Sequence, residues 1–112
     1  MIGLNLSGNV RLFLCREPVN MRKSFEGLSA LVEDLFPGEL LSGAFFIFLN
    51  RRKDHVKVLF WDTDGLVIWF KRLEKGSFRY KFGEDILIDR KAFLMMLEGV
   101  TPKRIQVRYK LS

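Results

Sequence analysis

Short apolar runs recur along the chain with the length and composition of β-strands. Each run is five or six residues long and rich in aromatic and β-branched side chains. These runs occupy residues 10–15, 45–49, 56–61 and 66–70. In a further segment, residues 78–82, Phe78, Tyr80 and Phe82 alternate with Arg79 and Lys81. This alternation predicts a fifth, half-buried strand.

Apolar residues spaced three and four apart predict two helices. We expect Asn20 to cap the first helix and Pro37-Gly38 to end it, with inward positions Met21, Phe25, Leu28, Val32 and Leu35. We expect the second helix to run from Arg90 to Glu98, after an Asp89 cap and before a closing Gly99. Its inward positions are Phe93, Leu94 and Leu97.

The elements follow one another in the order β-α-β-β-β-β-α, which predicts an α+β fold. The linkers between strands are short, so neighbouring strands should pair antiparallel, as a β-meander of about five strands with the two helices on one face. No repeat or linker divides the chain. We therefore expect one domain over residues 1–102, followed by a basic C-terminal tail at 103–112.

The two central strands are apolar on both faces, which a sheet covered on one face does not require. In residues 56–61, Val56, Val58 and Phe60 alternate with Lys57, Leu59 and Trp61, and residues 66–70 are apolar throughout. The second face could be covered by the tail, a second protomer or a partner protein. Alternatively, the two helices could divide between the faces. A homodimer is one of these possibilities.

Composition favours a folded, basic, cytoplasmic protein. The 112 residues are 48% hydrophobic, and 19 Lys and Arg against 13 Asp and Glu give a net charge of +6. Nucleic acid is the commonest partner of a small basic domain. The chain has neither an apolar stretch long enough for a membrane span nor a signal-peptide pattern. Its one cysteine, Cys15, excludes an internal disulfide and suggests a reducing compartment.

The positive charge is concentrated at the ends of the predicted hairpin that spans residues 50–78. Residues 51–57 carry a net +3, residues 71–81 a net +4 and the tail a net +4, whereas the first 36 residues balance to zero. In a meander the first two clusters meet at one sheet edge, opposite Asp62 and Asp64. We therefore predict DNA-phosphate contacts by Arg51, Arg52, Lys53, Lys57, Lys71, Arg72, Lys75, Arg79 and Lys81.

The Asp-Thr-Asp-Gly sequence at 62–65 allows an enzymatic alternative. FWDTDGLV resembles the first motif of haloacid-dehalogenase-type phosphatases, in which two Asp act beside magnesium. That chemistry needs a parallel sheet and later Lys and acidic residues, whereas Leu66 onward is itself a strand. A tight hairpin turn fits better. A metal cluster is disfavoured because a whole strand separates Asp54 from Asp62, and His55 is the only histidine. We therefore predict no catalytic residue, metal or cofactor.

Four segments of the sequence resemble a known family. MRKSFEGLSALV (21–32), FIFLNRRKDHVKVLFWDTDGLVIWFKRLEKGSF (46–78), LEGV (97–100) and the strand VRLFLC (10–15) have its order and spacing. The chain is similar to the accessory protein, usually called TnpB or the second open reading frame product, of bacterial insertion-sequence family sixty-six. The tail RIQVRYKLS lies outside the resemblance.

The resemblance implies a non-catalytic protein that works beside a DDE transposase and another product of the same element. Combined with the basic clusters, it predicts an accessory factor that binds DNA non-specifically through the sheet edge and assists the transposase. The alternative is a protein-interaction subunit that binds the transposase without contacting DNA.

Overall fold

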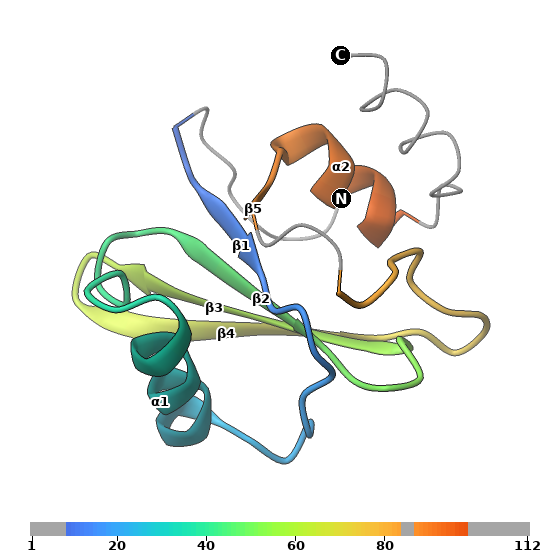
Figure 1. The fold of residues 1–112 in the computed structure, drawn as a ribbon, viewed down its shortest axis with the longest axis horizontal. Coiled ribbons are helices and arrows are strands. Elements are labelled where there is room, and N and C mark those ends of the chain that lie inside the picture. The colour runs from blue at the N-terminus through green and yellow to red at the C-terminus, as the bar shows by residue number, and fades with distance from the viewer. Residues whose placement is uncertain (1–8, 84–86, 99–112) are drawn as a thin grey trace.

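The computed structural model describes residues 9–83 and 87–98, which form a five-stranded sheet with one helix on each side (Figure 1). The elements in chain order are β1 (Leu12–Leu14), α1 (Phe25–Leu35), β2 (Phe45–Leu49), β3 (His55–Asp62), β4 (Gly65–Arg72), β5 (Leu87–Ile88) and α2 (Arg90–Leu97). This order and the α+β class confirm the prediction from the sequence.

The sheet is mixed, and the expectation of a purely antiparallel meander was wrong. Its strand order is β4-β3-β2-β1-β5, and β2, β3 and β4 form the predicted antiparallel meander. In contrast, β1 pairs parallel with β2 and antiparallel with β5. The physical reason is the connection from β1 to β2, which contains α1 and crosses back to the end where β1 began, as a parallel pair requires.

The fifth strand is not the predicted segment 78–82. The chain turns at Gly76, whose φ is +76°, and runs back against the loop between β2 and β3. There the Phe78 amide donates to the Lys53 carbonyl at 2.6 Å. We call residues 78–82 the strap. Aromatic and basic residues alternate in it because it buries Phe78 and exposes Arg79 and Lys81, although it does not join the sheet. The last strand is the short β5.

Each face of the sheet has its own core, so the expectation of both helices on one face was wrong and the divided alternative is confirmed. From β2, Phe45, Ile47 and Leu49 pack on one face with Phe93 and Leu97 of α2. Alternate β2 residues, Phe46 and Phe48, pack on the other face with Leu28 and Val32 of α1. The apolar pattern of β3 is thereby explained within one protomer, whereas β4, which was predicted to be central, is an edge strand with partly exposed apolar residues.

The helix boundaries agree with the sequence except at the start of α1. Ser24 is the N-cap residue, and the Asn20 side chain instead accepts a hydrogen bond from the Arg22 amide at 2.8 Å. α2 begins as predicted, because the Asp89 carboxylate accepts from the Ala92 amide at 2.7 Å.

The predicted Gly99 terminator, the domain boundary at 102 and the tail lie outside the described residues. Within the described part, neither helix is long and apolar enough to cross a membrane.

Candidate nucleic-acid interface

The β3–β4 hairpin has one basic end and one acidic end. His55 pairs with Arg72 at one end of the ladder, and Asp62 pairs with Gly65 at the turn that closes the other. The loop before β3 and the segment after β4 therefore meet, as the Leu73 amide donates to the Asp54 carbonyl at 2.7 Å. This confirms that the two clusters are neighbours, and Figure 1 shows both at the right of the view, far from the turn at the left.

Asn50 builds the loop that presents the first two arginines. Its side-chain oxygen accepts from the backbone amides of Asp54 and His55, both at 3.0 Å, and its amide nitrogen donates to the Asp54 carboxylate at 2.6 Å. These bonds close the loop. Arg51 and Arg52 stand at its tip with exposed side chains, held on an ordered backbone.

The side chains of Asp54 and His55 contact each other in the loop that carries Arg51 and Arg52. The distance from His55 Nδ1 to the nearer Asp54 oxygen is 2.8 Å. Hydrogen bonding from Asn50, and next from His55, lowers the pKa of the Asp54 carboxyl below its ordinary value. On its other side the His55 ring stacks on Phe70, with ring centroids 5.7 Å apart. Asp54 is therefore bonded within the loop, and the ion pairs among the described residues include neither Arg51 nor Arg52.

Lys57 does not belong to the exposed basic set. Its side chain is buried, with 9% of the residue exposed. Its Nζ donates to the carbonyl oxygens of Met21 and Lys23 at 2.8 and 2.7 Å and lies 5.1 Å from the Phe70 ring centre. Since these contacts use the ammonium group to hold the chain that leads into α1, we withdraw Lys57 from the predicted phosphate contacts.

Lys53 is likewise used within the fold. It adopts a positive φ of 61°, its Nζ donates to the Tyr80 carbonyl and the same nitrogen lies 5.4 Å from the Phe82 ring centre. Lys53 therefore ties the strap 78–82 to the β2–β3 loop. Its charge contributes to the local potential, but its ammonium group is already bonded.

The end of β4 and the segment that follows it supply the other cations. Lys71, Lys75 and Arg79 line a depression of about 330 Å³, together with Leu97 and Glu98 at the end of α2. Arg72 points to the opposite face and pairs with Glu74, with 3.0 Å between Nη2 and Oε2. Arg51, Arg52 and His55 line a second depression, of about 450 Å³. The cations thus surround the hairpin end on both faces of the sheet.

We define the basic surface as the exposed or half-exposed cations at this end whose charged groups are not bonded to the backbone of the fold: Arg51, Arg52, Lys71, Arg72, Lys75, Arg79 and Lys81. The two segments that carry it, 51–54 and 71–81, contain eight Lys and Arg against two acidic residues. That excess of six equals the net charge of the whole chain. The remaining residues sum to zero because the net +4 of residues 103–112 is offset by acidic residues elsewhere. Within the described residues, the hairpin end is where an anion would be attracted.

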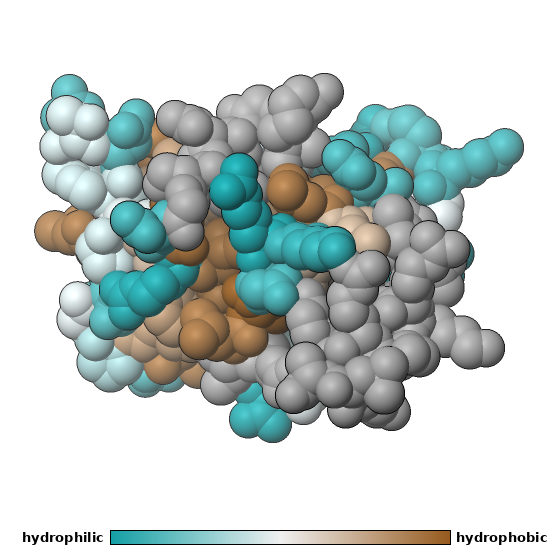
Figure 2. All heavy atoms as spheres, turned by 90° about the horizontal axis from the view of Figure 1, so that it is seen from above, coloured by the Kyte–Doolittle hydropathy of each residue, from teal (hydrophilic) through white to brown (hydrophobic). Residues whose placement is uncertain are grey.

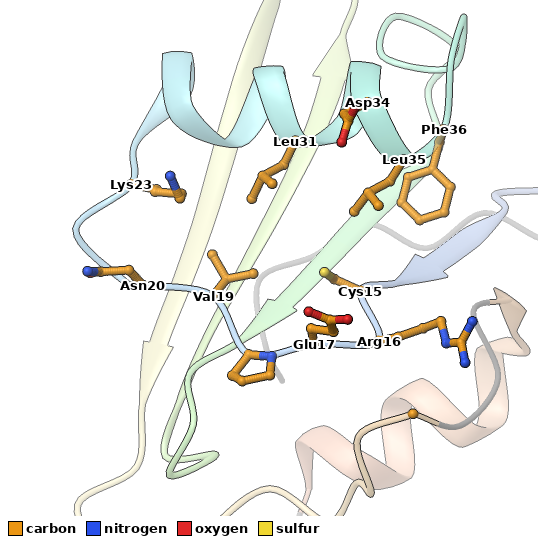
Figure 3. A pocket seen from close by; sticks show the side chains of 12 residues that line it. Cys15, Arg16, Glu17, Val19, Asn20, Lys23, Leu31, Asp34, Leu35 and Phe36 are labelled. Atoms are coloured by element: carbon orange, nitrogen blue, oxygen red, sulfur yellow. The ribbon is translucent and has the colours of Figure 1, made fainter.

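A cavity larger than either of these depressions lies elsewhere, between α1 and the chain that follows β1 (Figure 3). It has a volume of about 620 Å³ and carries charges of both signs, including Arg16, Lys23, Glu17 and Asp34. Cys15 also lines it, and burial raises the pKa of the Cys15 thiol, which disfavours the reactive thiolate. In the described ranges no group of three His, Cys, Asp or Glu residues is arranged to hold a metal ion.

Two contributors to the site were missed from the sequence. The sequence pattern places Asn50 in a turn without giving it a role, and it suggests His55 only as a metal ligand. Asn side chains that bond the backbone of their own loop are common in turns. The role of Asn50 in shaping this loop could therefore have been predicted from the sequence, whereas that of His55 could not. The side of the sheet to which Lys57 points depends on strand register, which the sequence pattern did not decide because both faces are apolar.

The sequence comparisons identify the family. The family model described as IS66 Orf2 like protein matches residues 10–107, which includes the first part of the tail. The uncharacterized protein y4jC of Sinorhizobium fredii (strain NBRC 101917 / NGR234) is 26% identical over 102 residues, covering 89% of this chain and 87% of the relative. Protein y4hO of the same strain is 29% identical over 94 residues, or 82% of each. No solved structure matches the chain. The chain belongs to the IS66 Orf2-like family of insertion-sequence proteins.

Proposed function

We propose that this protein is a non-catalytic accessory factor of insertion-sequence transposition that binds DNA through the basic surface and assists the transposase. Family membership supports the role in transposition. The observation that carries the DNA-binding step is the convergence at one hairpin end of the two cationic segments, which together contain eight Lys and Arg against two acidic residues.

The character of the side chains determines what kind of binding this surface supports. Lys and Arg on loops bind phosphate oxygens, which occur in every DNA sequence. The described helices lie over the two cores of the sheet, so neither projects from the basic surface as a base-reading helix would. We therefore propose sequence-tolerant contact with the DNA backbone, with an affinity that falls steeply as salt increases.

The test is fluorescence anisotropy of a labelled DNA duplex at several salt concentrations. The wild-type protein should bind at about 50 mM salt and lose affinity linearly on a logarithmic plot, with a slope of about −0.9 for each phosphate contacted. The double variant Arg51→Glu/Arg52→Glu should bind much more weakly, and its slope should be smaller by about 1 for each phosphate that the variant no longer binds.

A matched control carries the same charge change away from the basic surface. Arg90 and Lys91 are exposed in the first turn of α2, and glutamate is favourable at a helix start. Arg90→Glu/Lys91→Glu should therefore remain folded and bind DNA with the wild-type salt slope, apart from a small uniform loss from net charge. Equal loss in both double variants would show that net charge, and not the hairpin end, is responsible. Absence of wild-type binding at low salt would refute DNA contact.

A further inference from the structure

The outer edge of the sheet is a strand whose apolar side chains are only partly covered. β4 pairs with β3 on one side, and no other strand in residues 9–83 and 87–98 pairs with it on the other side. Leu66, Val67, Ile68 and Trp69 are half-exposed, and Phe70 has 52% of its surface accessible. Figure 1 shows β4 on the side of the sheet opposite β1 and β5.

Backbone hydrogen-bonding groups alternate in direction along an antiparallel edge strand. The Leu73 amide donates to Asp54, so odd-numbered residues of this ladder bond toward β3. The amides and carbonyls of Leu66, Ile68 and Phe70 consequently point away from the sheet. They form a regular row of donors and acceptors that a further strand could use.

The first six residues of β4 lack the features that usually protect a sheet edge. Proteins usually interrupt a long edge strand with proline, an inward-pointing charge or a bulge. The register of β4 with β3 is continuous from Gly65 to Arg72, and the six residues from Gly65 to Phe70 contain neither charge nor proline. Figure 2, which looks onto the molecule from the α2 side, shows apolar atoms lying beside charged side chains on that face.

We propose that β4 pairs antiparallel with β4 of a second copy of this chain, in the register that places Ile68 opposite Ile68. A two-fold axis perpendicular to the sheet relates the two strands, and the two sheets become one. Leu66 then faces Phe70 of the second copy on the α1 side. Val67 faces Trp69 of the second copy on the α2 side.

Charge distribution favours a second copy in the antiparallel orientation, and the register centred on Ile68 gives Arg72 an acidic partner. The strand has an acidic turn before it, with exposed Asp62 and Asp64, and basic residues Lys71 and Arg72 at its end. Antiparallel pairing about Ile68 places Arg72 of each copy opposite Asp64 of the other. The Arg72–Glu74 ion pair that this contact would replace is exposed, and exposed pairs contribute little. A parallel arrangement would instead place the two basic ends together.

Sedimentation velocity and a cysteine cross-link test the contact in the absence of DNA. At about 100 μM, a dimer with a Kd near 10 μM is mostly associated, so the wild-type chain should sediment as a dimer. Ile68→Cys should form a disulfide-linked dimer on mild oxidation, because directly opposed hydrogen-bonded residues have Cα atoms about 5.5 Å apart. Leu66→Cys, on the same face, is the matched control. It should stay unlinked, because the two copies of Leu66 lie about 13 Å apart along the strands.

Charge exchange provides the second test. Asp64→Arg and Arg72→Asp should each raise the dimer Kd up to about tenfold, because each variant replaces two symmetry-related attractions by repulsions. The double exchange should restore the Kd, with circular dichroism confirming the fold of each variant. The inference is overturned if the wild-type chain is a monomer at about 100 μM. It is also overturned if a dimer forms but Ile68→Cys fails to cross-link, or if the double exchange does not restore association, since the interface would then lie elsewhere.

Discussion

At the residue scale, Lys57 shows how burial changes the role of a charge. In the sequence it lies six residues beyond Arg51 in the same basic cluster. Its β3 position turns it inward, where two carbonyl oxygens and the face of Phe70 surround the ammonium group. A buried ammonium group is tolerated only when it is bonded in this way. Lys57 therefore stabilises the entry to α1, and does not contribute a phosphate contact.

Replacing Lys57 should affect folding and leave DNA binding intact. Lys57→Met keeps the length of the side chain but removes both hydrogen bonds, so we expect the free energy of unfolding to fall by about 1 to 3 kcal/mol. Urea denaturation measures this change. DNA affinity of the folded variant should remain close to that of wild type. The opposite pattern, unchanged stability with weakened DNA binding, would return Lys57 to the interface.

The lowered pKa of Asp54 makes the free energy of unfolding depend on pH in the acid range. Because the carboxylate form accepts hydrogen bonds from Asn50 and His55, its pKa is lower in the folded state than in the unfolded chain. The resulting stabilisation is complete above the unfolded pKa of about 3.9 and is lost as pH falls through the lower folded value. The stability difference between wild type and Asp54→Asn should therefore shrink on acidification from about pH 5 to about pH 2.5. A difference that is constant over this range would contradict the account.

At the element scale, the segments predicted well are those with an unambiguous local signal. β2 has the predicted boundaries, Asp89 caps α2, and the Asp-Thr-Asp-Gly turn joins β3 to β4. The prediction of a strand at 78–82 failed because alternation reports only which side chains are buried. It does not report whether the backbone has a pairing partner. The strap is instead held by Lys53, through a backbone and a side-chain bond.

The strap can be tested through its buried anchor. Phe78 is 1% exposed and packs in the α2-side core, so Phe78→Ala should reduce the free energy of unfolding by about 3 to 5 kcal/mol. Neighbouring Arg79 is exposed, and Arg79→Ala should change stability by no more than about 0.5 kcal/mol. Thermal or urea unfolding of the pair makes the comparison. Similar small effects for both variants would show that the strap is not anchored at Phe78.

At the scale of the whole molecule, the fold converts an uneven charge pattern into a polarised surface. The meander was predictable from short linkers, and with it the meeting of residues 51–53 and 71–75. The parallel pairing of β1 with β2 was not predictable in the same way, because it depends on how the α1 crossover packs. Division of the helices between the two faces follows from that crossover, and it covers apolar surface for which a second protomer had been one explanation.

NMR titration of the isotope-labelled protein with a short duplex would show, residue by residue, whether DNA binds at the basic hairpin end. We expect amide signals of residues 51–54, 71–75 and 79–81 to shift on addition of DNA and to recover with salt. Signals from the acidic turn at 62–65 and from the start of α2 should not move. Shifts concentrated at the acidic turn or at the start of α2, or no shifts at about 50 mM salt, would show that the hairpin end does not bind DNA.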